Sequence, residues 1–239
     1  MDNVKKYNKL IFVTIFAVGF ALIESAVVVY LRELYFPEGF GFPLKFFKPS
    51  LYIVEILREI ATIIVLAAVA HLSGINFYNR FAYFLISFGV WDIFYYVWLK
   101  IFLNWPESFL TWDVLFLIPI TWIGPVLAPI LCSILMIKIG VLIIELQSRN
   151  YRVKLKIYEW LLLFTGSLII FITFTYDYAS LIIKNNLLTR LSEIRYNPEL
   201  QEIFLSFAPT RFSWEYFILG YILLVLATIS FGFNSLKEK

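Results

Sequence analysis

Long apolar blocks separated by short polar segments dominate the sequence. A helix needs about 20 apolar residues to cross a hydrocarbon core about 30 Å thick, and six blocks reach this length. Because the blocks are apolar all round, they predict lipid-facing helices rather than the half-polar helices of a soluble domain. The sequence therefore predicts an all-α fold, a polytopic transmembrane bundle that forms one integral membrane domain over residues 1–239. The expected spans, about six in number, cover residues 10–31, 51–72, 81–103, 113–146, 157–176 and 214–233.

The fourth block is longer than one span requires and contains Pro119, Pro125 and Pro129. Proline removes a backbone donor and clashes with the preceding helical turn. We therefore expect a kinked or broken helix here, with a short outer piece followed by a full span.

The longest connection covers residues 177–213. Within it, Leu187, Leu188, Leu191 and Ile194 recur at helical spacing against polar neighbours. This pattern is typical of an amphipathic helix that lies on the membrane surface.

Basic residues indicate the orientation of the chain. Six spans would place residues 1–9, 73–80, 147–156 and 234–239 on one side, and these segments carry ten Lys and Arg residues. The connections on the other side carry seven over a much longer stretch. Because cytoplasmic segments are enriched in Lys and Arg, both termini are predicted to be cytoplasmic, in the plasma or inner membrane.

Composition narrows the possible chemistry. Hydrophobic residues make up 61% of the chain and charged residues 15%, against about 45–50% and about 25% in soluble domains. With one cysteine, Cys132, and one histidine, His71, the chain cannot build a disulfide framework, a Cys-rich metal site or bis-histidine haem ligation. We therefore predict no cofactor, no metal and no nucleic-acid partner. The expected partners are the lipid bilayer and either other membrane subunits or further copies of the chain.

Ionisable side chains within the first three predicted spans form the principal candidate site. A charged group in the hydrocarbon region is costly, so it normally faces a cavity or a partner. The spacing of residues 55, 58 and 59 places them on one helical stripe, and residues 92, 95 and 96 share another. At a helical rise of about 1.5 Å per residue, the groups lie about 10–16 Å from the outer ends of their spans. The candidate substrate- or ion-binding residues are Glu24, Glu55, Arg58, Glu59, Asp92, Tyr95, Tyr96 and Asp113.

The charges of this site do not balance. Within the first three spans, four carboxylates oppose only Arg58, before Lys100 is counted. Either some carboxylates are protonated, because desolvation raises the pKa of a carboxyl, or a cation or another subunit supplies positive charge. A purely structural explanation also stays open, with one internal ion pair over residues 55–59 and hydrogen bonds that only hold the helices together.

Three functions remain open on this evidence. The first is a small transporter or a proton- or ion-coupled protein with an outward-facing carboxylate–Arg–Tyr site, favoured by the buried charges and the interrupted fourth helix. The second is a non-catalytic subunit or assembly factor of a larger membrane complex, favoured by the 25 Phe, 15 Tyr and 7 Trp residues. The third is a membrane enzyme acting on a lipid or quinone-like substrate. Asp92 or Glu59 would then be the general acid or base, and Arg58 would hold an anionic group.

Overall fold

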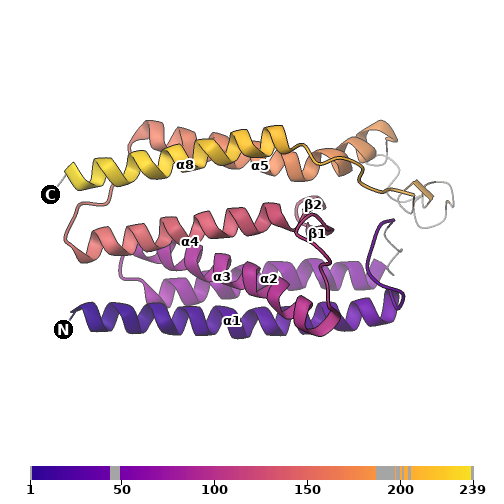
Figure 1. Ribbon diagram of the computed structural model, residues 1–239, viewed down its shortest axis with the longest axis horizontal. Helices are drawn as coiled ribbons and strands as arrows, with labels where there is room; N and C mark the ends of the chain where they lie inside the picture. Colours follow the sequence, from indigo (N-terminus) through magenta and orange to yellow (C-terminus); the bar gives the residue numbers. More distant parts are fainter. Residues whose placement is uncertain are drawn as a thin grey trace.

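In the computed structural model, the chain is described for residues 2–43, 49–186, 197, 200, 202–203 and 206–237. This part contains six long helices that lie side by side along one axis (Figure 1). Their bounds are α1 Asp2–Tyr35, α2 Pro49–Ser73, α3 Phe77–Leu103, α4 Leu127–Ser148, α5 Ile157–Lys184 and α8 Trp214–Lys237. The two ends of the chain lie at the same end of the bundle.

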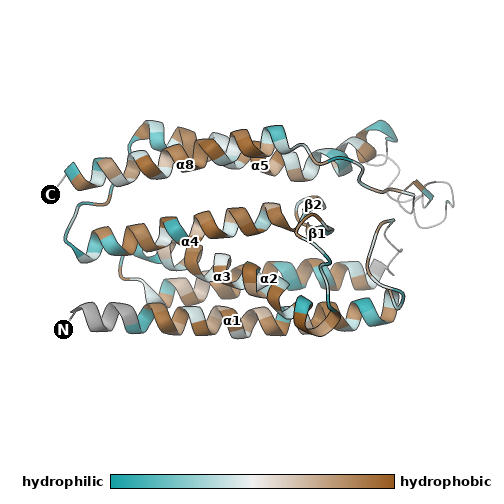
Figure 2. Ribbon diagram, viewed as in Figure 1, coloured by the Kyte–Doolittle hydropathy of each residue, from teal (hydrophilic) through white to brown (hydrophobic). Residues whose placement is uncertain are grey.

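The molecule is a helical membrane bundle. Five helices of the described part are long and apolar enough to cross a membrane: Asn8–Tyr35, Phe77–Leu103, Leu127–Ser148, Ile157–Lys184 and Trp214–Lys237. Figure 2 shows apolar residues along the lengths of these helices and many polar residues toward their ends. The remaining helix, α2, packs beside α1 and α3. Six membrane crossings therefore stay a prediction.

The helices form two packed groups. In the first, α3 contacts α1, α2 and α4; in the second, α5 pairs with α8. In both groups, small residues allow neighbouring helices to approach closely. Between α3 and α4, a Cβ on Gly140 would lie 2.7 Å from the Ala82 carbonyl oxygen. Between α5 and α8, a Cβ on either Gly166 or Gly220 would lie 2.8 Å from the other residue's carbonyl oxygen. Membrane helices associate through this kind of close packing, because lipid provides no hydrophobic drive between them.

The prediction of a helix at the start of the fourth block is wrong. Residues 112–125 instead form an antiparallel hairpin of β1 (Trp112–Phe116) and β2 (Trp122–Pro125). The physical reason is that prolines at 119 and 125 interrupt helical hydrogen bonding, while the apolar run of β1 suits a short strand equally well. The full span that follows begins at Leu127. Pro129 lies in its first turn, where the missing N–H costs nothing.

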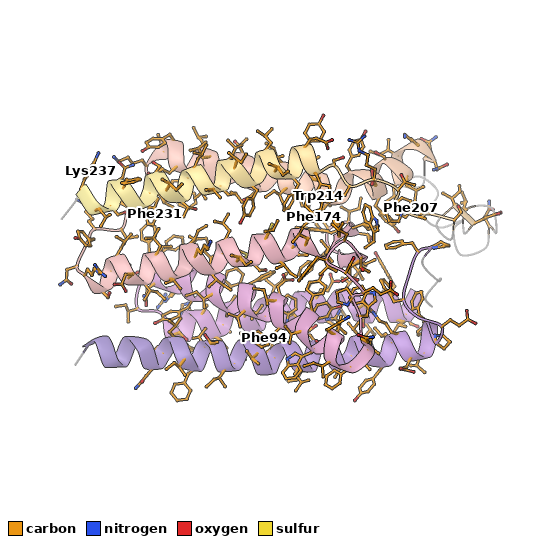
Figure 3. The ribbon with its side chains drawn as sticks, in the orientation of Figure 1. Phe94, Phe174, Phe207, Trp214, Phe231 and Lys237 are labelled. Carbon is orange, nitrogen blue, oxygen red and sulfur yellow. The ribbon has the colours of Figure 1, made fainter. Side chains whose placement is uncertain are left out.

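The hairpin lies near the end of the bundle opposite the termini and is packed against protein (Figure 1). The Trp122 ring is 5.1 Å from the Phe171 ring and 5.9 Å from the Phe174 ring of α5. Figure 3 shows Phe174 and Trp214 toward this end, and Phe231 toward the opposite end of α8. Non-helical backbone at membrane depth requires such cover, because lipid cannot satisfy its polar groups.

The connection expected over 177–213 is shorter than predicted, because α5 continues to Lys184. The predicted amphipathic surface helix, with Leu187, Leu188, Leu191 and Ile194, lies outside the described residues.

Candidate functional site

Arg58 of α2 makes two ion pairs, one of which joins α2 to α1. Its Nη1 pairs with Glu24 Oε2 of α1. Its Nη2 lies 2.9 Å from Glu55 Oε2, one turn away on α2, and its Nε donates to the same oxygen at 3.0 Å. Thr62 donates its hydroxyl to the other Glu24 oxygen. Both carboxylates are buried, so one guanidinium satisfies two carboxylates away from water.

Glu59 shares the helical stripe but faces a different partner. Both of its carboxylate oxygens accept hydrogen bonds from the backbone N–H of Leu117, at 3.1 and 2.9 Å. Leu117 follows β1 in the loop of the hairpin, where the N–H has no ladder partner. Glu59 therefore connects α2 to the hairpin, rather than adding to the Arg58 ion pairs.

Asp113 is held by α1 and α3. Its Oδ1 lies 3.3 Å from Arg32 Nη2, and its Oδ2 accepts a hydrogen bond of 3.2 Å from the Tyr96 hydroxyl. The Arg32 guanidinium lies over two aromatic rings that are perpendicular to each other, with its Cζ 4.1 Å from the centre of Phe40 and 3.7 Å from that of Trp105. The negative faces of aromatic rings attract a cation, and this contact orients the Arg32 guanidinium toward β1.

Arg32 is the functional candidate that the sequence analysis missed. The first span was expected to cover residues 10–31, which leaves Arg32 in the outer connection that follows it. Instead, α1 continues to Tyr35, and Arg32 is 6% exposed. The sequence does contain an indication that Arg32 faces other helices. Ser25 and Arg32 are seven residues apart, so they share a helical face. Ser25 also faces α3, because its hydroxyl donates to the Tyr95 carbonyl oxygen at 3.2 Å.

Asp92 joins α3 to α4. Its Oδ2 accepts a hydrogen bond of 2.7 Å from the Ser133 hydroxyl, and both residues are buried. The Tyr95 ring stacks on Trp91 at a centroid distance of 6.3 Å and makes an edge-to-face contact with Tyr96 at 5.1 Å. The sequence placed these residues on one stripe, but the structure gives each of them a separate partner.

We call this set the hairpin-end cluster. It comprises Glu24, Arg32, Glu55, Arg58, Glu59, Asp92, Tyr95, Tyr96 and Asp113. Five carboxylates face two guanidinium groups, which leaves a formal excess of three negative charges. Lys100 does not reduce this excess within the cluster, because it is exposed and donates to the carbonyl oxygens of Asn104 and Pro106. The carboxylates are spread over four contacts, and no three His, Cys, Asp or Glu side chains of the described chain are grouped to hold a metal ion.

A second polar group, centred on one buried carboxylate, lies between α5 and α8 toward the end that carries the termini. The sequence analysis did not find it. We call it the Glu159 cluster, made of Tyr158, Glu159, Ser230 and Asn234. Glu159 is fully buried, and its Oε1 accepts hydrogen bonds from the Ser230 hydroxyl at 2.8 Å and the Asn234 amide at 2.7 Å. Its Oε2 accepts from the Lys156 backbone N–H at 2.8 Å. One carboxylate is thus satisfied by three neutral donors.

No known protein family, curated protein or solved structure matches this chain.

Proposed function

We propose that the chain is a small proton- or ion-coupled membrane transporter, and that the hairpin-end cluster is its coupling site. The observation that carries this proposal is that the cluster contains five buried carboxylates but only two guanidinium groups, an excess of three carboxylates. Uncompensated charge in a low-dielectric interior is unstable, so bound protons or cations must neutralise part of it. A site that needs such ions to be stable is suited to exchanging them.

The surroundings of the cluster support this function. Transporters frequently place their ion and substrate sites where a membrane helix is interrupted. Here a hairpin takes the place of the outer part of a helix, and the Asp113 side chain and the Leu117 N–H attach it to α1, α2 and α3. The hairpin is thus an irregular segment bonded to the charged groups of three helices.

We propose six crossings, with α2 as the second, and both termini in the cytoplasm. An even number of crossings agrees with the position of both chain ends at one end of the bundle. The ten basic residues of the segments at that end favour the cytoplasmic side. The hairpin-end cluster then lies in the outer half of the membrane and opens outward.

The test uses the purified full chain in proteoliposomes that contain a pH-sensitive dye. Gradients of protons, Na⁺, K⁺, Mg²⁺ or Ca²⁺ are imposed in turn, and the internal pH is followed. We expect at least one cation gradient to move protons faster than in protein-free liposomes. The Glu24→Gln variant should lose this movement. The matched control is Glu145→Gln, because Glu145 pairs with Arg149 on the exposed surface of α4.

Two results would contradict the proposal. One is proton movement no faster than in protein-free liposomes for every gradient. The other is an equal loss of proton movement in the Glu24→Gln and Glu145→Gln variants. If the first result were combined with co-purification of other polypeptides in a fixed ratio, the chain would instead be a subunit of a larger membrane complex.

A further inference from the structure

Two buried hydrogen-bond donors of the hairpin-end region have no acceptor. Arg32 Nη1 and Trp105 Nε1 lie in side chains that are 6% and 8% exposed, and neither has a hydrogen-bond partner. The two side chains are stacked on each other, with the Arg32 Cζ 3.7 Å from the Trp105 ring centre. The two donors therefore belong to side chains in direct contact, one on α1 and one in the segment that follows α3. A desolvated N–H without an acceptor is unfavourable, so this arrangement favours binding an oxygen.

The other arginine of the hairpin-end cluster, Arg58, indicates what kind of acceptor Arg32 can bind. Arg58 holds two carboxylates, with Glu24 on Nη1 and Glu55 on Nη2 and Nε. Arg32 holds one, Asp113 on Nη2, while its Nη1 remains without a partner. A guanidinium has donors on more than one edge and can satisfy two carboxylates at once, as Arg58 does.

We propose that Arg32 Nη1 and Trp105 Nε1 bind a carboxylate group of the transported solute, in the role that Glu24 has at Arg58. This inference rests on the proposed transport function. A carboxylate has two acceptor oxygens and can accept from both donors. A phosphate group carries more charge and more acceptor oxygens than these two donors satisfy, and it would meet stronger repulsion from the five carboxylates nearby.

The same repulsion links the solute to the coupling ion. An anion at Arg32 is disfavoured while the hairpin-end cluster keeps its excess of three negative charges. Protons or cations bound by the cluster remove part of this repulsion and strengthen carboxylate binding, and by linkage the bound carboxylate strengthens cation binding by the same factor. The carboxylate and the coupling cation are therefore expected to bind cooperatively, each raising the affinity for the other.

The binding test measures unfolding of the full chain in detergent by its helical circular dichroism, which does not depend on tryptophan fluorescence. The probes are acetate and benzoate for soluble carboxylates, oleate for a lipid carboxylate, and inorganic phosphate. We expect at least one carboxylate to raise the unfolding temperature in a saturable way, and phosphate to raise it less. A response to oleate alone would identify the bound carboxylate as that of a lipid acid.

Two conservative variants test the assigned donors. Trp105→Phe keeps an aromatic ring over the guanidinium but removes Nε1, and Arg32→Lys keeps the charge but removes Nη1. Each should weaken carboxylate binding by about tenfold, the effect of one charge-assisted hydrogen bond. The matched control is Trp91→Phe, which removes another buried indole N–H without a partner, from a side chain in a different core cluster than Trp105. Because Arg32→Lys alters a buried ion pair, Trp105→Phe decides the outcome if that variant does not fold.

The inference is overturned if no carboxylate stabilises the wild-type chain, or if Trp105→Phe binds carboxylate as tightly as Trp91→Phe. The result is separable from the proposed function. Carboxylate binding without ion movement in proteoliposomes would leave the site standing and remove the transport function. Cation-driven proton movement without carboxylate binding would leave the transport function standing and remove the carboxylate site.

Discussion

The hairpin-end cluster and the Glu159 cluster solve the same problem, a carboxylate buried among membrane helices, in opposite ways. Glu159 is satisfied by three neutral donors contributed by α5 and α8. The hairpin-end cluster gathers five carboxylates and two guanidinium groups from three helices and a hairpin. One of its donors, Arg32 Nη1, has no acceptor, and neither has Nε1 of Trp105, whose ring contacts Arg32. A single buried carboxylate can be satisfied by donors on the helices around it. An excess of negative charge beside N–H groups that have no acceptor instead indicates groups that exchange ligands.

The two regions also differ in what their bonds connect. The Glu159 contacts join only α5 and α8, a pair that also meets at Gly166 and Gly220. The contacts of Asp113 and Glu59 join the hairpin to α1, α2 and α3. We therefore expect substitutions in the Glu159 cluster to act on stability alone. Substitutions in the hairpin-end cluster should act on stability, ion movement or both.

The largest expected effect is that of Asp113→Ala. This change leaves the buried Arg32 guanidinium without its carboxylate and removes the acceptor of the Tyr96 hydroxyl. We expect the free energy of unfolding to fall by about 3–5 kcal/mol, measured by circular dichroism in mixed micelles of increasing SDS content. The control is Glu145→Ala, which breaks the exposed pair with Arg149 and should cost at most about 1 kcal/mol. Equal losses would show that burial of the Arg32 pair has no energetic consequence.

Next in size is Gly220→Leu, which tests the α5–α8 contact. Even the Cβ of the new side chain would lie 2.8 Å from the Gly166 carbonyl oxygen, so the helices must separate. Overpacking of this kind costs about 3 kcal/mol, read from the same SDS titration. Gly19→Leu in α1 is the control, because nothing lies within 4 Å of a Cβ there, and it should unfold like the wild type. If both variants unfold alike, close packing does not hold α5 to α8.

A pair of Glu→Gln variants compares the two clusters directly. Glu159→Gln turns one acceptor oxygen into a donor that faces donors, and it should lower the free energy of unfolding by about 2 kcal/mol. Its ion movement in proteoliposomes should remain that of the wild type. Glu24→Gln should instead abolish ion movement, while Arg58 keeps Glu55 as a partner. Loss of ion movement in both variants would remove the distinction between the clusters.

The bundle could be predicted from the sequence because hydrophobicity in blocks of span length depends on no tertiary contact. The hairpin could not be predicted from the sequence. The run Trp112–Phe116 is too short for periodicity to separate a strand from a helix, and the prolines after it are compatible with a kinked helix. What decides the outcome is aromatic packing against α5, for example of Trp122 on Phe174, and such contacts are not readable along the chain.

The candidate site was only partly predictable for a related reason. Helical spacing placed Glu55, Arg58 and Glu59 on one stripe, but spacing says nothing of partners on other elements. Glu59 therefore binds the hairpin rather than Arg58. Arg32 and Glu159 were missed because each lies near the end of a helix, where a charged side chain is expected to reach water. Their burial depends on neighbours distant in sequence: Phe40 and Trp105 for Arg32, Ser230 and Asn234 for Glu159.

The smallest expected effect is that of Ser133→Ala, and it tests whether Asp92 belongs to the exchanging region. The change removes the 2.7 Å hydrogen bond to Asp92 and should lower the free energy of unfolding by about 1 kcal/mol. Because Asp92 then holds its charge with one donor fewer, the variant should also need a different proton or cation concentration for half-maximal ion movement. Ser73→Ala is the control, since that hydroxyl binds only a carbonyl oxygen of its own helix. A shift in stability with an unchanged ion dependence would place Asp92 with Glu159, as a group that holds helices together and carries no ion.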